Sequence, residues 1–448
     1  MVGTSSREHW SSRLSFILAA AGSAVGLGNI WKFPYITGAN GGGAFVAVYL
    51  ACIAMVGLPI FIAELFIGQK AQANVVQAFE ATHRPRSPWR FVGWLSLVSA
   101  VLILSFYSVV GGWVLDFVFR SLTDQFAGHS DEEIRGMLGS LFAHPARQLF
   151  WHALFMGATM AIVLQGISAG LERWNRILMP GLFILLLLLL VRAAFLPGMG
   201  QALRFLFVPD ATRLTAAGVL EAVGHSFFTL SLGMGAMITY GSFLRSNQEL
   251  TRTALSVAAL DTLIALVAGT VIFSVVFSHG LDASSGPTLM FQTLPMLFAK
   301  LPGGYFVSLA FFLLVTFAAL TSAISLLEVA AAYWVERHGT ARKPTVLALG
   351  AIIYVLGIPS ALSPNLLGDV RLLGHTFFDL VDKLTSSLFL PLGGALISIF
   401  FGWVLSPQAA DEVLGHRFRP AARMLMWTAR VLAPLAVGVI LVRGLRDW

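Results

Sequence analysis

The feature that most constrains the fold is the recurrence of long apolar segments along almost the entire 448-residue chain. A helix needs about 20 predominantly apolar residues to cross a lipid bilayer. The sequence therefore predicts about eleven spanning segments, at 14–37, 43–69, 90–120, 148–165, 174–196, 220–244, 253–279, 303–335, 345–360, 374–405 and 422–443. Hydrophobic residues make up 57% of the chain and charged residues 11%, which excludes an ordinary soluble domain. We expect an all-α polytopic protein in which residues 1–448 form a single membrane domain.

The distribution of charge predicts how the chain is oriented in the bilayer. Basic residues gather in alternate short connections, beginning with 70–90, whereas the long connection 121–147 on the opposite face carries four acidic residues. By the positive-inside rule the N-terminus is cytoplasmic, and an odd number of spans places the C-terminus outside. The formal net charge of +7 is thereby explained and is no evidence for a nucleic-acid partner. The single cysteine, Cys52, excludes a disulfide framework.

The first apolar segment contains residues that weaken a helix in its middle. Gly22, Gly26 and Gly28 lie there, followed by Asn29 and Pro34. Each glycine costs a helix about 1 kcal/mol relative to alanine. In hydrocarbon the freed backbone groups have no water to bind, so another group must use them. The stretch predicts a helix that is interrupted in order to bind ions or a polar solute.

A second interruption falls in the sixth segment, at Ser231-Leu232-Gly233-Met234-Gly235. The first and sixth segments are five apart in the chain, and because five is odd, a second unit of five spans enters the membrane with the opposite orientation. We therefore expect a 5+5 inverted repeat, 14–196 and 220–405, with discontinuous helices 1 and 6 and an additional helix at 422–443. Paired interruptions of this kind indicate a midplane binding site in secondary transporters. The alternative is two kinked helices that pack through small residues.

Asp261 is an acid inside an otherwise apolar span. A carboxylate within the membrane is costly and is by default a hypothesis for a functional site.

Other classes of membrane protein fit the sequence less well than a transporter does. A channel would need a ring of charges or a carbonyl filter motif. A membrane enzyme would need a nucleophile–base pair or a metal cluster, and the ten histidines are scattered without HExxH spacing. We expect no enzymatic activity.

Several motifs resemble the neurotransmitter:sodium symporter family. They are Arg7-Glu8-His9-Trp10, the glycine-rich stretch through Pro34, Asn40-Gly41-Gly42-Gly43-Ala44-Phe45, Gly224-His225-Ser226-Phe227-Phe228-Thr229-Leu230-Ser231-Leu232-Gly233 and Leu320-Thr321-Ser322. They cover nearly the whole chain in the family's order, and they are most similar to those of bacterial amino-acid symporters with eleven spans and the leucine-transporter fold. That fold is itself a known example of discontinuous helices around a midplane site. The resemblance implies sodium-driven uptake of amino acids by alternating access across the bacterial cytoplasmic (inner) membrane.

The resemblance also implies which residues bind the amino acid. The backbone amides of Leu27 and Gly28, with the hydroxyl of Tyr107, would hold its carboxylate, since the N-terminus of a half-helix favours an anion. Carbonyls near Ala24, Phe228 and Ser231 would meet its ammonium group. The remaining substrate contacts would come from Ser23, Ile103, Thr229, Met234, Ser322, Ala323 and Leu326. This lining is mostly apolar and uncharged, which favours a hydrophobic L-amino acid, aliphatic or aromatic.

Two sodium sites follow from the same resemblance. The first would use Ala24, Asn29, Thr229, Asp261 and an oxygen of the substrate. The second would use Gly22, Val25, Ala318, Thr321 and Ser322, although serine and threonine in membrane helices more often bond their own backbone. Many family members carry asparagine at the position of Asp261 and bind chloride nearby, so we expect the carboxylate here to make chloride unnecessary. His225 lies near that anion site and would either pair with Asp261, exchange a proton, or be an ordinary core histidine.

The family also implies two gates and one unwinding helix. Lys32 would pair with Asp382 on the outer side, where lysine lacks the bidentate geometry of arginine. Arg7, supported by Trp10, would pair with Glu336 on the inner side. Snorkelling of the basic side chains is the alternative for both gates. The spacing from Gly170 to Pro180 would let the inner end of the fifth helix unwind and admit water to the second sodium. A membrane sensor that binds an amino acid without transporting it is the alternative function.

Overall fold

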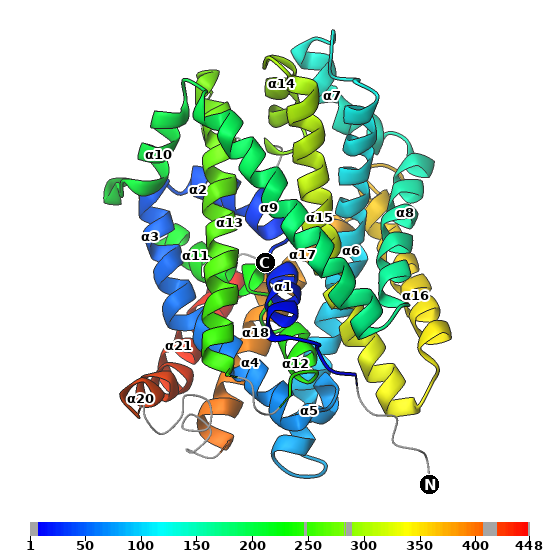
Figure 1. Ribbon diagram of the computed structural model, residues 1–448, viewed down its shortest axis with the longest axis vertical. Helices are drawn as coiled ribbons and strands as arrows, with labels where there is room; N and C mark the ends of the chain where they lie inside the picture. Colours follow the sequence, from blue (N-terminus) through cyan, green and yellow to red (C-terminus); the bar gives the residue numbers. More distant parts are fainter. Residues whose placement is uncertain (1–7, 246–248, 282, 284–288, 406–418, 447–448) are drawn as a thin grey trace.

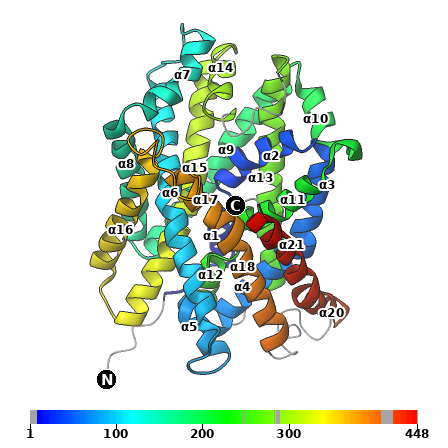
Figure 2. The same ribbon diagram turned by 180° about the vertical axis from the view of Figure 1, so that it is seen from behind.

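The computed structural model describes residues 8–245, 249–281, 283, 289–405 and 419–446, and these form helices and no named strand (Figures 1 and 2). The elements at the predicted spans are, in chain order, α1 (Arg13–Ala24), η1 (Gly28–Lys32) and α2 (Phe33–Ala39); α3 (Gly43–Cys52), η2 (Ile53–Gly57) and α4 (Leu58–Ala71); α6 (Arg90–Leu122); α8 (Pro145–Val163); η3 (Ile167–Glu172) and α9 (Arg173–Ala194); α11 (Ala216–Thr229) and α12 (Ala236–Gly241); α13 (Leu250–Ser278); α15 (Gly304–His338); α16 (Arg342–Leu362); α17 (Phe377–Lys383), η6 (Leu384–Phe389), α18 (Leu390–Ile399) and η7 (Phe400–Val404); and α20 (Arg419–Trp427), η9 (Thr428–Leu432) and α21 (Ala433–Arg446).

Within the described ranges, eight helices are long and apolar enough to cross a membrane, and a ninth span is the bent pair Arg13–Ala24 and Gly28–Ala39. The other two of the eleven predicted segments are α8 and the interrupted pair α11–α12, which are helical but not among those nine. The prediction of an all-helical, multi-span membrane protein is confirmed. The division into the repeats 14–196 and 220–405 with an extra helix stays a prediction.

Short helices lie beyond the spans at both ends of the bundle. We call one end the α5 end, after α5 (Val75–Thr82), which lies at the bottom of Figure 1. We call the other the α7 end, where α7 (Asp131–Phe142), α10 (Met199–Phe207) and α14 (Thr293–Ala299) lie at the top. The connection between α10 and α11 contains the 3-10 turn η4 (Ala211–Arg213).

Burial distinguishes the helices that build the core from those that face lipid. Most residues of α6 and α15 are buried, including nearly every position of α15 from Val315 to Tyr333. The most apolar stretches of Ile167–Ala194 and Arg423–Arg443, in contrast, are 33% buried. The interrupted α1 is buried along its whole second half, although it contains Gly22 and Ser23. The breaks therefore lie inside the protein, where side chains can satisfy their backbone groups.

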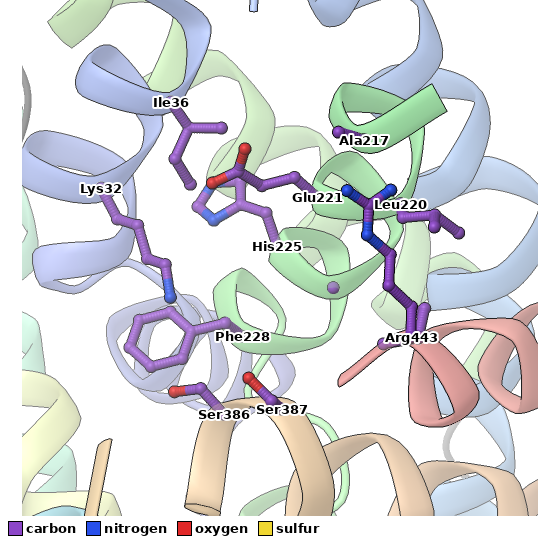
Figure 3. A pocket seen from close by; sticks show the side chains of 12 residues that line it. Lys32, Ile36, Ala217, Leu220, Glu221, His225, Phe228, Ser386, Ser387 and Arg443 are labelled. Atoms are coloured by element: carbon purple, nitrogen blue, oxygen red, sulfur yellow. The ribbon is translucent and has the colours of Figure 1, made fainter. Parts of the chain in front are cut away.

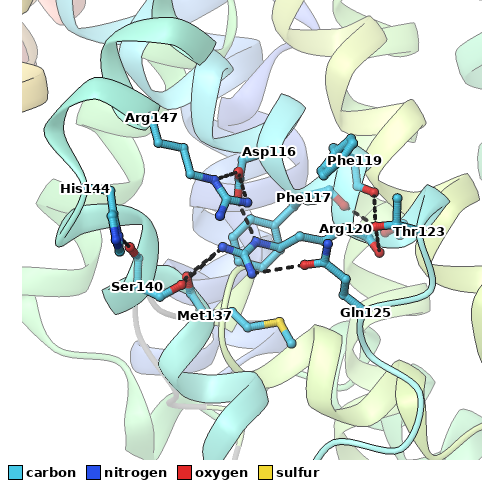
Figure 4. A network of polar contacts seen from close by, with 11 residues as sticks. Asp116, Phe117, Phe119, Arg120, Thr123, Gln125, Met137, Ser140, His144 and Arg147 are labelled. Atoms are coloured by element: carbon cyan, nitrogen blue, oxygen red, sulfur yellow. Dashed lines mark hydrogen bonds and ion pairs between the residues drawn. The ribbon is translucent and has the colours of Figure 1, made fainter.

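The α7 end carries a cap that is fixed by charge (Figure 4). Asp116 of α6 is fully buried and pairs with Arg120, at 2.6 Å, and with Arg147 of α8, at 2.6 Å. Arg120 also donates to the carbonyl of Met137 and to the hydroxyl of Ser140, both on α7. At the start of α7, the Ser130 backbone N–H and hydroxyl hold the pKa of the Glu133 carboxyl below its usual value. The cap is thus tied to α6 and α8.

Candidate functional site

Both predicted breaks are present. The first helix bends by 51° between Ala24 and Gly28, where Val25 is extended at φ −73° and ψ 99°. The second opens between Thr229 and Ala236, where Ser231, Gly233 and Gly235 have φ of 54°, 80° and 75°. These left-handed values favour glycine, which explains why two of the three positions are glycines. The sequence pattern and the backbone therefore agree on where the helices stop.

Side chains from other helices bind the backbone groups that the breaks release. The Ser231 hydroxyl donates to the carbonyl of Ser23 at 2.8 Å and so joins the two breaks. The amide of Leu27 donates to the Tyr107 hydroxyl oxygen at 3.3 Å. The amide of Gly233 donates to Glu64, a fully buried carboxyl on α4, at 2.7 Å. Each interruption is thus stabilised by a polar side chain from a continuous helix.

A small enclosed cavity of about 20 Å³ lies between the breaks. Its lining residues are Ser23, Ala24, Gly26, Leu27, Gly28, Ile103, Tyr107, Phe228, Ser231, Met234, Ser322, Ser325 and Leu326. The structure therefore brings together all of the predicted substrate-binding residues except Thr229 and Ala323, which are not among the lining residues. Such a volume holds about one water molecule, so side chains must move before an amino acid enters. Met234 has a flexible side chain that can do so.

The predicted first sodium site is a buried cluster of oxygen-bearing side chains. Asn29 donates from Nδ2 to the Asp261 carboxylate at 2.7 Å and to the Asp261 carbonyl at 3.0 Å. The Thr229 hydroxyl lies 3.1 and 3.0 Å from the two carboxylate oxygens. All three side chains are fully buried. Ala24, the fourth predicted ligand, lines the neighbouring cavity. Carboxylate, amide and hydroxyl oxygens suit a hard cation.

The predicted second sodium site is also assembled around the first break. The Ser322 hydroxyl lies 3.4 Å from the carbonyl oxygens of Gly22 and Val25. The Thr321 hydroxyl donates to the Ala318 carbonyl at 3.0 Å. A Cβ at Gly22 would lie 3.1 Å from the Thr321 side chain, so glycine permits this close approach. All five predicted ligand positions therefore lie where α1 meets α15.

The predicted outer pair of Lys32 and Asp382 is not formed among the described residues. Lys32 places its ammonium 4.7 Å from the centre of the Phe228 ring, and no ion pair joins it to Asp382 in the described part of the chain. Asp382 instead accepts from the Ser386 hydroxyl at 3.0 Å. A cavity of about 340 Å³ lies beside Lys32 and is lined by residues of η1, α2, α11, η6 and α21 (Figure 3). Glu221, His225 and Arg443 also line it.

His225 is a buried histidine between this cavity and the carboxylate cluster. Its ring stacks on Phe33, at 6.1 Å, and lies against Tyr49, at 5.3 Å. Neither ring nitrogen has a hydrogen-bond partner among the described residues, so the predicted pairing with Asp261 is not formed. Its packing between two aromatic rings is that of a core histidine.

At the α5 end the N-terminal segment is held by Trp10. Trp10 is 1% exposed and donates from Nε1 to the carbonyl of Tyr240 at 3.0 Å. Glu336 accepts from the backbone amide of Asn74, just before α5, at 2.8 Å. Arg7, the predicted partner of Glu336, lies outside the described residues. Trp10 therefore takes the predicted position while the Arg7–Glu336 pair stays a prediction.

The inner end of the fifth helix is helical here, with Gly170 in η3 and Pro180 inside α9. Two carboxylates secure it. Glu8 accepts from the amide of Ile167 at 2.7 Å, and Glu172 accepts from the amide of Ser11 at 3.1 Å. The unwinding predicted for Gly170 and Pro180 would have to break these contacts. The sequence alone did not suggest them.

Three further residues belong to the site but were not predicted. Glu64 could have been found by the rule that selected Asp261, because it is a lone acid in an apolar segment. Ser325 lies one helical turn after Ser322 and therefore shares its face. Asn175 keeps a buried Oδ1 without a hydrogen-bond partner, 2.3 Å from where a Cβ at Gly22 would lie. Its sequence context carries no signal for this role.

These features define a class of protein. A helical membrane protein with two interrupted helices, an enclosed cavity between them and buried oxygen ligands beside it is a secondary transporter. In the described ranges, no three His, Cys, Asp or Glu side chains form a metal-binding group.

Comparison with known proteins names the family. The model of the sodium:neurotransmitter symporter family matches residues 7–133 and 145–445. The sodium-dependent transporter YhdH of Bacillus subtilis is 37% identical over 96% of this chain and 96% of its own, and a sodium-dependent transporter of Haemophilus influenzae is 32% identical over 98% of each. The crystal structure of MhsT in complex with L-phenylalanine superposes with a TM-score of 0.91 at 45% identity, over 98% of this chain and 100% of that one. The chain belongs to the sodium:neurotransmitter symporter family and is a sodium-dependent transporter rather than an enzyme.

Proposed function

We propose that this protein couples the inward sodium gradient to the uptake of hydrophobic L-amino acids, aliphatic or aromatic. The observation that carries the proposal is the cavity between the two breaks, lined by apolar side chains and bordered by the buried Asn29–Thr229–Asp261 cluster. The binding of L-phenylalanine by MhsT, a relative of the same fold, supports this class of substrate.

In this proposal the first break binds the polar end of the amino acid. Leu27 and Gly28 present backbone amides to its carboxylate, together with Tyr107. Its ammonium group meets carbonyls at Ala24, Phe228 and Ser231. No acidic side chain lines the cavity, which disfavours amines that lack a carboxylate. The apolar side chain then lies among Ile103, Met234 and Leu326.

Two sodium ions accompany the amino acid, one at Ala24, Asn29, Thr229 and Asp261 and one at Gly22, Val25, Ala318, Thr321 and Ser322. The carboxylate of Asp261 supplies a permanent negative charge beside the first ion. A site with that charge built in has no need of chloride. We therefore propose chloride-independent transport.

Transport proceeds by alternating access in the cytoplasmic membrane of a bacterium. The basic connections place the α5 end and the N-terminus in the cytoplasm. Lys32 and Asp382 meet when the α7 end closes, and Arg7, Trp10 and Glu336 separate when the α5 end opens. Unwinding between Gly170 and Pro180 then exposes the second sodium to water.

Uptake by proteoliposomes tests this function. Under an imposed inward sodium gradient, labelled leucine, tyrosine or tryptophan should accumulate above equilibrium and should leak out when the gradient is collapsed. Binding of the amino acid without accumulation would overturn the symporter and would instead support a sensor. Asp261→Asn should weaken sodium dependence or create chloride sensitivity, and unchanged ion dependence would refute the proposed charge replacement.

A further inference from the structure

Two serines form an unusual hydrogen-bonded pair in the wall of the enclosed cavity. The Ser23 hydroxyl of α1 donates to the Ser325 hydroxyl oxygen of α15 at 2.8 Å, and Ser325 donates to the carbonyl of Ser322 at 2.8 Å. Both serines are 1% exposed and both line the cavity. Tyr107, Ser231 and Ser322 also line the cavity, and the Ser23–Ser325 pair adds to these polar groups a bond between two hydroxyls that has a defined direction.

The direction of the two bonds determines what the wall can recognise. A hydroxyl has one proton to donate and two lone pairs to accept with. Both protons are committed, the first to Ser325 and the second to Ser322. Ser23 Oγ therefore keeps its lone pairs, and no donor among the described residues is directed at it. This part of the wall accepts a hydrogen bond but does not offer one.

Serines that serve only to satisfy themselves behave differently in this protein. Ser99 and Ser121 donate to the carbonyls of Leu95 and Phe117, four residues earlier on their own helix, which is the common arrangement in membrane helices. Ser23 instead reaches across to another helix and leaves its acceptor capacity beside the cavity. The lone pairs of Ser23 Oγ can therefore accept a hydrogen bond from a donor on a bound ligand.

The Ser23–Ser325 pair also lies on the side of the cavity that faces the α5 end, where the side chain of the proposed substrate would extend. Ser23 precedes Leu27 toward the α5 end, and Ser325 follows Ser322 in the same direction, because α15 ends where Glu336 meets Asn74. An amino acid with its carboxylate at Leu27 and Gly28 extends its side chain away from them, past Ile103, Met234 and Leu326. The ring of an aromatic substrate thereby approaches the two serines.

We infer that Ser23, held by Ser325, selects aromatic amino acids that carry a hydrogen-bond donor on the ring, namely tyrosine and tryptophan, over phenylalanine. This inference rests on the proposed function and narrows its substrate class. One hydrogen bond in an apolar site corresponds to about three- to tenfold in affinity. The phenol and the indole N–H are the donors that fit.

Competition binding on the purified full-length protein tests this, with labelled phenylalanine displaced in the presence of sodium. Tyrosine should bind about three- to tenfold more tightly than phenylalanine. Tryptophan should bind more tightly than 3-benzothienylalanine, its isostere without the N–H, by a similar factor. Ser23→Ala should remove both preferences, so that tyrosine binds no more tightly than phenylalanine and tryptophan no more tightly than 3-benzothienylalanine. Ser325→Ala frees the proton of Ser23, so O-methyltyrosine, which only accepts, should gain affinity.

Ser308→Ala is the matched control, since Ser308 is a buried serine of the same helix that bonds only the carbonyl of Tyr305. It should behave as the wild-type protein. Equal affinities within each pair in the wild type, or a uniform loss for all ligands in Ser23→Ala, would overturn the inference. Sodium-driven accumulation of phenylalanine in proteoliposomes tests the proposed function independently, and neither of these two binding results would change it.

Discussion

The two ends of the bundle differ in how side chains hold the first broken helix to its neighbours. At the α5 end, charged and aromatic side chains tie the N-terminal segment to η3, α9 and α12. Trp10 is buried there against Phe16, Tyr240 and Phe243. At the α7 end, a cavity of about 340 Å³ reaches Lys32 and His225, beside the first break.

Both ends contain buried ion pairs, but these act on different parts of the molecule. At the α7 end the carboxylate of Asp116 fixes the cap to α6 and α8 and leaves the broken helices alone. At the α5 end Glu172 binds Ser11 and Arg176, and Arg176 also donates to Ser15 of α1. Polar contacts at the α5 end therefore bind the segment that includes α1, whereas the ion pairs of Asp116 join only α6 and α8. This comparison can be tested with substitutions at each end.

The largest effect should come from Arg342 at the α5 end. Arg342 of α16 pairs with Glu328 of α15, whose side chain is fully buried, and donates from Nε to the Val163 carbonyl at 3.0 Å. Arg342→Met leaves a buried, unpaired carboxyl group, which costs about 3–5 kcal/mol. Thermal unfolding in detergent should show a large loss. The double variant Glu328→Leu with Arg342→Met should recover most of the stability. A double variant as unstable as the single one would contradict this account.

Trp10→Ala should have the next largest effect. It removes a buried ring that packs on three aromatic side chains and costs about 3 kcal/mol. The segment 236–241 of α12 should then exchange its amide hydrogens faster, because the N-terminal segment no longer covers it. Trp403→Ala is the control, since Trp403 is 66% exposed and should change little. If exchange in α12 is unaffected, Trp10 is not what closes this end.

Glu8→Gln should act locally and more weakly. The carboxylate of Glu8 accepts from the amides of Ile167 and Ser168, at 2.7 and 3.4 Å. A neutral amide weakens these bonds by about 1 kcal/mol. Hydrogen exchange over 167–172 should therefore accelerate about fivefold while the rest of α9 is unchanged. Glu80→Gln, which alters an ion pair with Arg90 at 3.6 Å, should leave this segment as it was.

The helix breaks and the contacts at the two ends of the bundle differ in how far the sequence predicts them. The breaks and the buried carboxyl group beside the first of them were predictable, because Gly22, Gly26 and Asp261 are unfavourable in the apolar helices in which they lie. The side-chain contacts at the two ends of the bundle were not predictable. Lys32 lies over Phe228 rather than at Asp382, and the bonds of Glu8 to Ile167 and of Glu172 to Ser11 were not predicted. Such pairs depend on which end is open, and sequence carries no information about the state of a two-state protein.

The smallest effect should come from Lys32, although the family resemblance made it a gate. Its ammonium contacts the face of the Phe228 ring, an interaction of about 0.5–1 kcal/mol at an accessible site. Lys32→Met should therefore barely change thermal stability, and hydrogen exchange at the α5 end should be unaffected. Its cost should appear in transport, as a slower turnover, because the outer pathway then closes without a cation opposite Asp382. Lys32→Arg should restore turnover. A loss of stability comparable to that of Arg342→Met would contradict this account, because it would mean that Lys32 contributes strongly to holding the helices together on this side.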